Sequence, residues 1–358
     1  MCIRDRNYFT QYIFRDVSMV PNTVSESILP NGNIQRTTPE LITPAGMHLT
    51  SGVQLQSTWD LSESNTLIAG IDVWGRNLKT EREKYIKVEV LNPDNEIILT
   101  NQLERGETPI PLSGFYSSGI FLQDEIHLLN DRLTLVAGGR LDEIRVNNEQ
   151  GLDVDYLVVN GTRNDAPPTQ RVTFEENSER SLSWSASAGM LYQLHRDINA
   201  SLNVARSFRS PSLEERFKYI DLGNFVRLGD PSLEPEKGFS ADLGVRIWNP
   251  GFTFQSSLFV NRITDMIVES PGEFIYTLAS GSDPDTIPAL VNSNVAQALL
   301  YGWDIHFEYH VYSNFVLFGS GSYVRGKDTG AGKDLPMIPP LNGRAGIRYT
   351  NPKAGSVE

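Results

Sequence analysis

The segment between residues 206 and 230 concentrates guanidinium and aromatic side chains. A guanidinium can hold a carboxylate or phosphate through two parallel hydrogen bonds, so several in one segment favour binding of an anionic ligand. The interleaved acids Glu214, Glu215 and Asp221 allow another interpretation, in which the same cations form salt bridges locally. The candidate ligand-binding residues are those of this segment and one histidine from another long connection: Arg206, Arg209, Arg216, Tyr219, Phe225, Arg227 and His48.

Alternation of apolar and polar residues predicts the elements that position this segment. Just after it, Phe239, Leu243 and Val245 alternate with Ser240 and Asp242. A period of two over this length indicates a β-strand with one apolar face. The sequence shows no amphipathic helical stretch and no capping box followed by an apolar helical stripe. It predicts about twelve strands, near residues 7–19, 47–60, 65–78, 115–128, 132–145, 180–194, 198–208, 238–248, 252–267, 298–311, 314–326 and 341–350.

The connections between these strands alternate between short and long. Hairpin-length turns are expected at 61–65, 130–131, 195–197, 249–251 and 312–314, and long loops at 20–46, 79–114, 146–179, 209–237, 268–297 and 327–340. Because successive hairpin strands run in opposite directions, all short turns lie at one edge of the sheet and all long loops at the other. This asymmetry is typical of outer-membrane barrels.

The strand near 298–311 shows why one face should contact lipid. Leu299, Trp303 and Phe307 share one face, whereas Asp304 and His306 share the other. A soluble protein would need a second layer to cover this apolar row, and no helices are predicted to supply it. A charge on such a face would cost about 2–4 kcal/mol at the bilayer midplane. The predicted fold class is therefore all-β, an antiparallel transmembrane β-barrel.

Composition excludes several other classes. The net charge of −13 argues against a nucleic-acid partner, because phosphates would not be neutralised. No apolar run is long enough for a transmembrane helix. The single cysteine, Cys2, permits no internal disulfide. No Ser–His arrangement indicates a hydrolase, so the chain is not expected to be an enzyme, and no cofactor or metal site is predicted.

Several motifs in family order resemble the barrel of TonB-dependent outer-membrane receptors, over roughly residues 50–350. They include the hairpin from Gly119 to Asp142 and the segment Met337-Ile338-Pro339-Pro340. Two boxes that resemble those of haem and haemoglobin receptors carry the most family information. Their residues are Phe208, Arg209, Ser210 and Pro211 in the first, and Asp230, Pro231, Leu233, Pro235 and Glu236 in the second.

The resemblance implies a barrel of about 22 strands with an N-terminal plug. It also implies location in the outer membrane of a Gram-negative bacterium and uptake of an extracellular iron chelate, powered by the inner-membrane TonB complex through an N-terminal segment. Twelve strands are only part of such a barrel. We expect residues 7–358 to be a partial barrel without plug and terminal strands. The charged residues 1–6 lack the apolar run of a signal peptide and are expected to be a non-native leader.

The ligand stays open at this point. In the haem receptors that the boxes resemble, a histidine between the boxes ligates haem, but residues 212–229 contain none. Haem and a ferric siderophore are both retained as expected ligands. The alternatives are another nutrient such as cobalamin, or a passive porin-like or adhesin barrel. Arg140 and Asp142 are expected to form a pair across strands or to brace the plug rather than to bind ligand.

Overall fold

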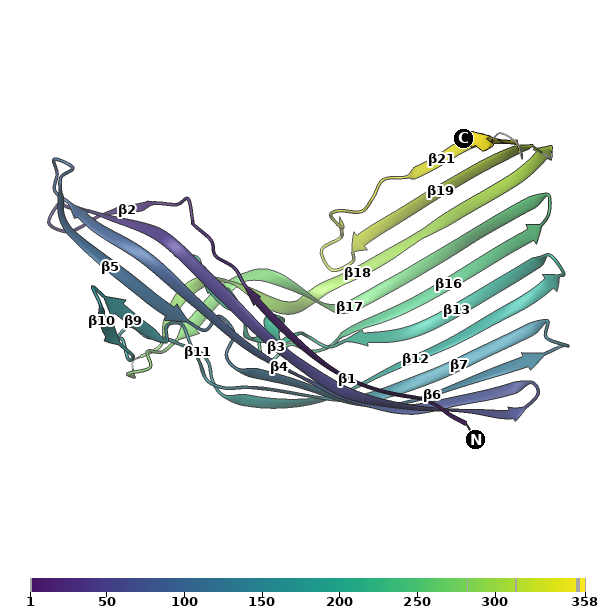
Figure 1. Cartoon of the computed structure of the whole chain (residues 1–358), viewed down its shortest axis with the longest axis horizontal. Coiled ribbons are helices and arrows are strands. Elements are labelled where there is room, and N and C mark those ends of the chain that lie inside the picture. Colours follow the sequence, from purple (N-terminus) through teal and green to yellow (C-terminus); the bar gives the residue numbers. More distant parts are fainter. Residues whose placement is uncertain (1, 282, 313, 352–354, 358) are drawn as a thin grey trace.

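Long antiparallel strands form almost the whole molecule. The computed structural model describes residues 2–281, 283–312, 314–351 and 355–357. Each of twelve long strands pairs with the next, which confirms the predicted number and fold class (Figure 1). They are β1 (Cys2–Asp16), β3 (Ile34–Ser62), β4 (Asn65–Leu91), β6 (Ser113–Leu128), β7 (Leu133–Asn148), β12 (Asn177–His195), β13 (Ile198–Arg209), β16 (Glu236–Asn249), β17 (Phe252–Tyr276), β18 (Asp285–Tyr312), β19 (Phe315–Asp328) and β21 (Asn342–Asn351).

Short and long connections alternate as expected. Short turns follow β3, β6, β12, β16 and β18, and they gather at the right of Figure 1, while the long connections leave the opposite ends. The turn expected at 312–314 contains Ser313, and the expected leader contains Met1; both residues lie outside the described part. Within the described residues, β1 and β21 do not pair with each other, so this sheet is open.

The two faces of the wall differ as the alternation predicts. Met190, Leu202, Leu243 and Leu258 lie opposite one another on four successive strands, and their exposed fractions are 37, 40, 48 and 53%. On the other face, their neighbours Gly189, Asn203 and Asp242 lie opposite one another in a row that continues to Phe259, while Ser257 lies opposite Gly244. A continuous exposed apolar row is what lipid stabilises, so we assign this side as the outer face and the polar side as the lumen.

The long connections contain far more β-structure than expected. β4 continues to Leu91 and β17 to Tyr276, beyond the predicted ends at residues 78 and 267. An additional strand pairs with the extended β4, and a small hairpin pairs with that strand: β5 (Ile97–Glu107), then β9 (Tyr156–Val159) and β10 (Thr162–Asn164). The expectation that these segments are loops was wrong. In the extension of β4, Ile86, Val88 and Val90 alternate with Lys87 and Glu89, so a period of two continues beyond residue 78.

One short helix begins with a capping box, although the sequence shows no capping box followed by an apolar helical stripe. Helix α1 spans Leu213–Phe217. Ser212 accepts a hydrogen bond from the Glu215 backbone, and the Glu215 side chain accepts one from the Ser212 backbone, which completes a capping box. Five residues are too few to show a helical period. The remaining elements are β2 (Ser25–Ile28), β8 (Gly151–Leu152), β11 (Val172–Phe174), β14 (Tyr219–Asp221), β15 (Val226–Leu228), β20 (Lys333–Asp334) and β22 (Gly355–Val357).

A hydrophobic core lies on the lumen side at the long-loop end. It is built around residues 210–235, which we call the strap. Leu213 and Phe217 of the strap belong to one buried cluster with Ile144 and Val146 of the β7 wall. The same cluster includes Phe274 of β17, and β15 of the strap pairs in parallel with β18. The strap therefore ties two distant parts of the wall together. No helix in the described residues is long and apolar enough to span a membrane.

Candidate functional site

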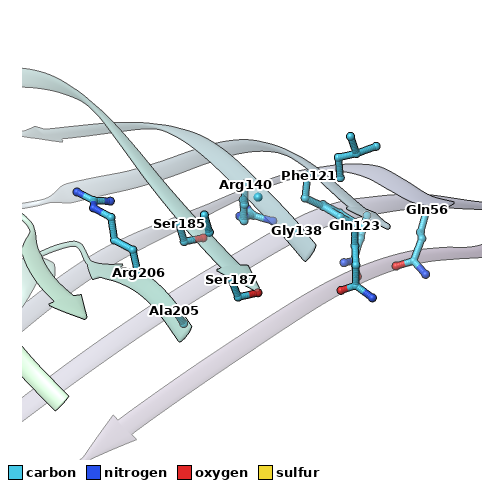
Figure 2. Close-up of a pocket in the computed structure, with 13 residues that line it drawn as sticks. Gln56, Phe121, Gln123, Gly138, Arg140, Ser185, Ser187, Ala205 and Arg206 are labelled. Carbon is cyan, nitrogen blue, oxygen red and sulfur yellow. The ribbon is translucent and has the colours of Figure 1, made fainter. Parts of the chain in front are cut away.

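A polar hollow of about 410 Å³ lies against the lumen face of β3, β6, β7, β12 and β13 (Figure 2). Side-chain alternation turns most of its polar residues inward, onto the same face as Asp72 and Asp142, whereas Arg206 borders the hollow from the outer face. Amides and hydroxyls supply both donors and acceptors, and one aromatic ring adds an apolar surface. Such a lining can bind a polar, oxygen-rich ligand. Its side chains are those of Gln54, Gln56, Phe121, Gln123, Arg140, Ser185 and Ser187.

Arg140 is fixed within this hollow by two carboxylates. Its Nε lies 2.8 Å from Oδ2 of Asp142, and its other end contacts Asp72 on β4. Asp142 is buried. Gly119 lies between these two acids in the register, and a Cβ there would come within 2.5 Å of Asp142 Oδ1, so a larger residue would displace the Arg140–Asp142 pair. Arg140 therefore joins β7 to β4 across β6. Arg140 and Asp142 do pair, but both lie on β7, so the expectation that they pair across strands was wrong, and the partner across strands is Asp72.

Arg209 joins the two ends of the strap. Its Nη1 lies 2.8 Å from Glu215 Oε2, and its Nε lies 2.7 Å from Glu236 Oε2. Burial opposes ionisation of Glu215, but the hydrogen bonds from Arg209 and the Ser212 backbone prevail and lower the pKa of that carboxyl. The same carboxylates raise the pKa of Arg209. This guanidinium is therefore occupied on both sides by acids of the chain itself.

The other strap cations are also paired. Arg216 is buried and contacts Glu179 of β12 at 2.9 Å. Lys218 and Arg227 share Glu269, at 3.0 and 2.6 Å. These pairs agree with the interpretation that the cations of this segment form salt bridges. Of the acids that pair with Arg209, Arg216, Lys218 and Arg227, only Glu215 was among the three acids expected from the sequence.

Tyr219 lies in the strap core rather than at a free surface. It is buried, and its ring contacts Phe274 with ring centroids 5.5 Å apart. Burial, together with the negative charges of Asp221 and Asp153, raises the pKa of Tyr219 to about 12. Its hydroxyl therefore stays protonated at neutral pH.

The remaining candidate residues do not converge on one point. Phe225 is half-buried in the strap. His48 lies on the lumen face opposite Leu78. Arg206 lies opposite Ala186 and Phe239 and therefore belongs to the outer face. A ligand-binding role for Arg206, Arg209, Arg216, Tyr219, Phe225, Arg227 and His48 stays a prediction.

The two family boxes have a structural role at the ends of the strap. Phe208 packs against the strap core and Pro211 is fully buried. Asp230 accepts hydrogen bonds from the Ser232 backbone and hydroxyl at 2.8 and 2.6 Å, and Leu233 is buried. The boxes thus fix where the strap leaves and rejoins the wall.

Sequence reasoning missed Arg15 and the polar lining of the hollow. Arg15 of β1 pairs with Gly46, two residues from His48 on β3, so both side chains lie diagonally on the lumen face. No ion pair of Arg15 is found in the described part of the chain, in contrast to the strap arginines. Lumen-facing parity could have identified these residues, because it applies to polar positions as well as to apolar ones.

A family model described as TonB dependent receptor-like, beta-barrel matches residues 5–356 of the chain. No curated protein with which the sequence was compared matches it.

Three solved structures with a similar fold are described as transporters or receptors. The copper transporter OprC has a TM-score of 0.61 and 16% identity, with 96% of this chain and 50% of that chain covered. The ferric citrate transporter FecA in the unliganded form has a TM-score of 0.52 and 14% identity, with 97% of this chain and 47% of that chain covered. The third is a double mutant of the Serratia marcescens hemophore receptor HasR in complex with its hemophore HasA and heme. It has a TM-score of 0.50 and 11% identity, with 96% of this chain and 62% of that chain covered. This chain spans about half to three-fifths of those chains.

Proposed function

Because the chain belongs to the TonB-dependent receptor β-barrel family, we propose that it forms part of an outer-membrane receptor that takes up an iron chelate in a Gram-negative bacterium. The observation that carries the proposal is the two-faced wall: an exposed apolar outer face and a lumen face with a polar hollow of about 410 Å³. Lipid stabilises the first face, and the second offers hydrogen bonds to a polar ligand.

The proposal assigns residues 7–358 to one part of a larger barrel. The plug, the remaining strands and the segment that contacts the inner-membrane TonB complex would come from the rest of the same receptor. The coverage of 47–62% of the similar chains supports this assignment.

The choice of an iron chelate rests on the lumen near the strap. Arg15 has no ion pair in the described residues and lies beside His48, so it can donate paired hydrogen bonds to a carboxylate of an anionic chelate. Two of the similar folds are named for ferric citrate and for heme, and a third for copper. Haem and a ferric siderophore both carry acidic oxygens that would suit Arg15.

Uptake by the full-length receptor in its outer membrane tests the proposal. Cells that lack the gene are complemented with the receptor and supplied with ⁵⁵Fe as haem, ferric citrate or a ferric siderophore. We expect uptake of one chelate that stops when TonB is deleted. Arg15→Gln should lower that uptake at least about threefold, through loss of one charge-assisted bond, with receptor abundance unchanged. The exposed Arg163→Gln, which removes the same charge far from the lumen, is the matched control.

Three results would overturn the proposal. Uptake that persists without TonB would indicate a passive pore. Uptake of cobalamin or copper with none of the iron chelates would reassign the substrate. Equal uptake by the Arg15→Gln and Arg163→Gln variants would remove Arg15 from the ligand path.

A further inference from the structure

One row across the outer face alternates cationic and apolar residues. Direct pairing places Ala186 opposite Arg206, Arg206 opposite Phe239, and Phe239 opposite Arg262. The row continues through Leu299 to Lys327. Residues directly opposite in antiparallel strands share one face, and Phe239 is 51% exposed, so all of these residues belong to the outer face.

The cations of this row lack acidic partners. Within the described residues, Arg206, Arg262 and Lys327 form no ion pair, whereas the neighbouring outer-face cations Lys237 and Arg325 pair with Asp265 and Asp334. The chain carries a net charge of −13, and acids are abundant near the strap. Three unpaired cations in one row therefore mark a local site for an external anion.

Arg206 is held in place before any ligand arrives. The hydrogen-bonded pairing of β12 with β13 ends at Ala186 and Arg206. At this fork, Arg206 donates to the free carbonyl of Trp184, and its guanidinium lies 3.7 Å from the centre of the Trp184 ring. The cation–π contact fixes the side chain against the outer face and leaves other N–H donors available.

The height of the row matches a membrane boundary. Phe239 lies ten residues from Asn249, where β16 ends at the short-turn side. At about 3.4 Å per residue and a tilt of about 40°, this distance spans roughly 26 Å along the membrane normal, close to the apolar band of about 25 Å in such barrels. The cations therefore lie at the headgroup level on the long-loop side, where charge is tolerated.

We propose that Arg206, Arg262 and Lys327 bind the phosphate groups of a phosphorylated lipid in the outer leaflet, while its acyl chains pack on Phe239, Leu243 and Leu258. Arg206 and Arg262 are two strands apart, roughly 10 Å between Cα atoms, so one headgroup with two phosphates can contact both. The proposal rests on the outer-membrane location that the proposed function includes.

Binding to the purified full-length receptor tests the site without reference to uptake. The probes are lipid A with two phosphates and the same lipid without phosphate, with retention in nonionic detergent measured by native mass spectrometry. We expect the phosphorylated lipid to bind at least about tenfold more tightly, and Arg206→Gln/Arg262→Gln to abolish that preference. Arg132→Gln/Arg196→Gln removes the same charge at the short-turn end and should keep the preference within about twofold of the original.

Further arms distinguish the alternatives. Inorganic phosphate at the same concentration should not displace the lipid; complete displacement would show a free-phosphate site and overturn the proposal. Equal affinity of the original receptor and the Arg206→Gln/Arg262→Gln variant, or of the two lipids, would also overturn it. Heat-modifiable migration checks folding, and Arg206→Lys/Arg262→Lys, which keeps the charge, should retain most of the preference if the Gln variant misfolds. Failure of iron uptake with lipid binding retained would refute only the proposed substrate.

Discussion

Arg216 Nη1 donates to Glu179 Oε2 at 2.9 Å and thereby joins the strap to wall strand β12. The same guanidinium donates to the carbonyl of Leu233 at 2.6 Å and to that of Pro231. The pairing of β12 with β13 stops at Ala186, so these contacts link β12 to the strap beyond the point where the β12–β13 hydrogen bonds end. The strap is therefore part of the wall on the long-loop side rather than a loose loop above it.

Replacing Arg216 should release the strap. Arg216 is only 3% exposed, so Arg216→Ala leaves two buried carbonyls without a donor and Glu179 without its cation. We expect a local loss of about 2–3 kcal/mol in the opening free energy of residues 213–233, measured by hydrogen exchange of the full-length receptor. Arg180→Ala is the control, since the Arg180 side chain is 64% exposed and should contribute less than about 1 kcal/mol. Equal exchange in the two variants would contradict the role of Arg216 in joining the strap to β12.

Acidification should loosen helix α1. Burial opposes ionisation of Glu214, but the hydrogen bond from Arg76 prevails and lowers its pKa below 4.5, and the pKa of Glu215 is lowered as well. A lowered native-state pKa stabilises the fold above the unfolded-state value and loses that contribution as pH falls through the native value. The helix should therefore loosen only below about pH 4.5.

A spin label at the exposed position 222 reports this transition. In a Cys2→Ser/Leu222→Cys receptor, the label should gain mobility as pH falls below about 4.5. Burial raises the pKa of Asp153 and Asp155, so protonation of these two acids acts in the opposite direction as pH falls. Glu214→Gln should reduce the pH response. A label mobility that is unchanged across this range would refute the role of the two glutamates.

The Tyr156 hydroxyl lies between two carboxylates where β9 pairs with β5. Its hydroxyl lies 3.0 Å from both Glu83 and Glu104. Burial and these two hydrogen bonds raise the pKa of Tyr156. Tyr156→Phe should loosen β5 by about 1 kcal/mol, because the two carboxylates lose the hydroxyl that they share as a hydrogen-bond donor. Hydrogen exchange of residues 97–107 measures this. Tyr85→Phe, which removes a hydroxyl that contacts Glu83 alone, should have the smaller effect; the reverse order would contradict the account.

The wall was predictable because lipid imposes a period of two on one face. Leu202, Leu243 and Leu258 alternate with Asn203, Asp242 and Ser257 in the sequence, and the structure places each set on one face. The polar residues 79–84 interrupt the apolar alternation of β4, so the extension to residue 91 was missed, although Ile86, Val88 and Val90 alternate again with Lys87 and Glu89. Helix α1 was missed because only Ser212 and Glu215 mark it.

The candidate site was less predictable than the wall. Clustered arginines near residue 216 indicate an anion only if they are unpaired, and pairing depends on distant acids such as Glu179 and Glu269. Long-range contacts of this kind leave no local sequence signal. The lumen hollow likewise forms from five strands that are separated in the chain, and it becomes visible only once their register is known.

The central claim is that the apolar face of the wall contacts lipid. Its most direct test is the same substitution at two adjacent residues that lie on opposite faces. Leu202 belongs to the apolar outer row and Asn203 to the lumen row. The folded fraction of the full-length receptor in bilayers is measured by heat-modifiable migration across a urea titration. If β13 spans the membrane as assigned, Leu202→Arg should cost about 2–4 kcal/mol and Asn203→Arg less than about 1 kcal/mol. Equal costs, or a larger cost at Asn203, would show that this face does not contact lipid.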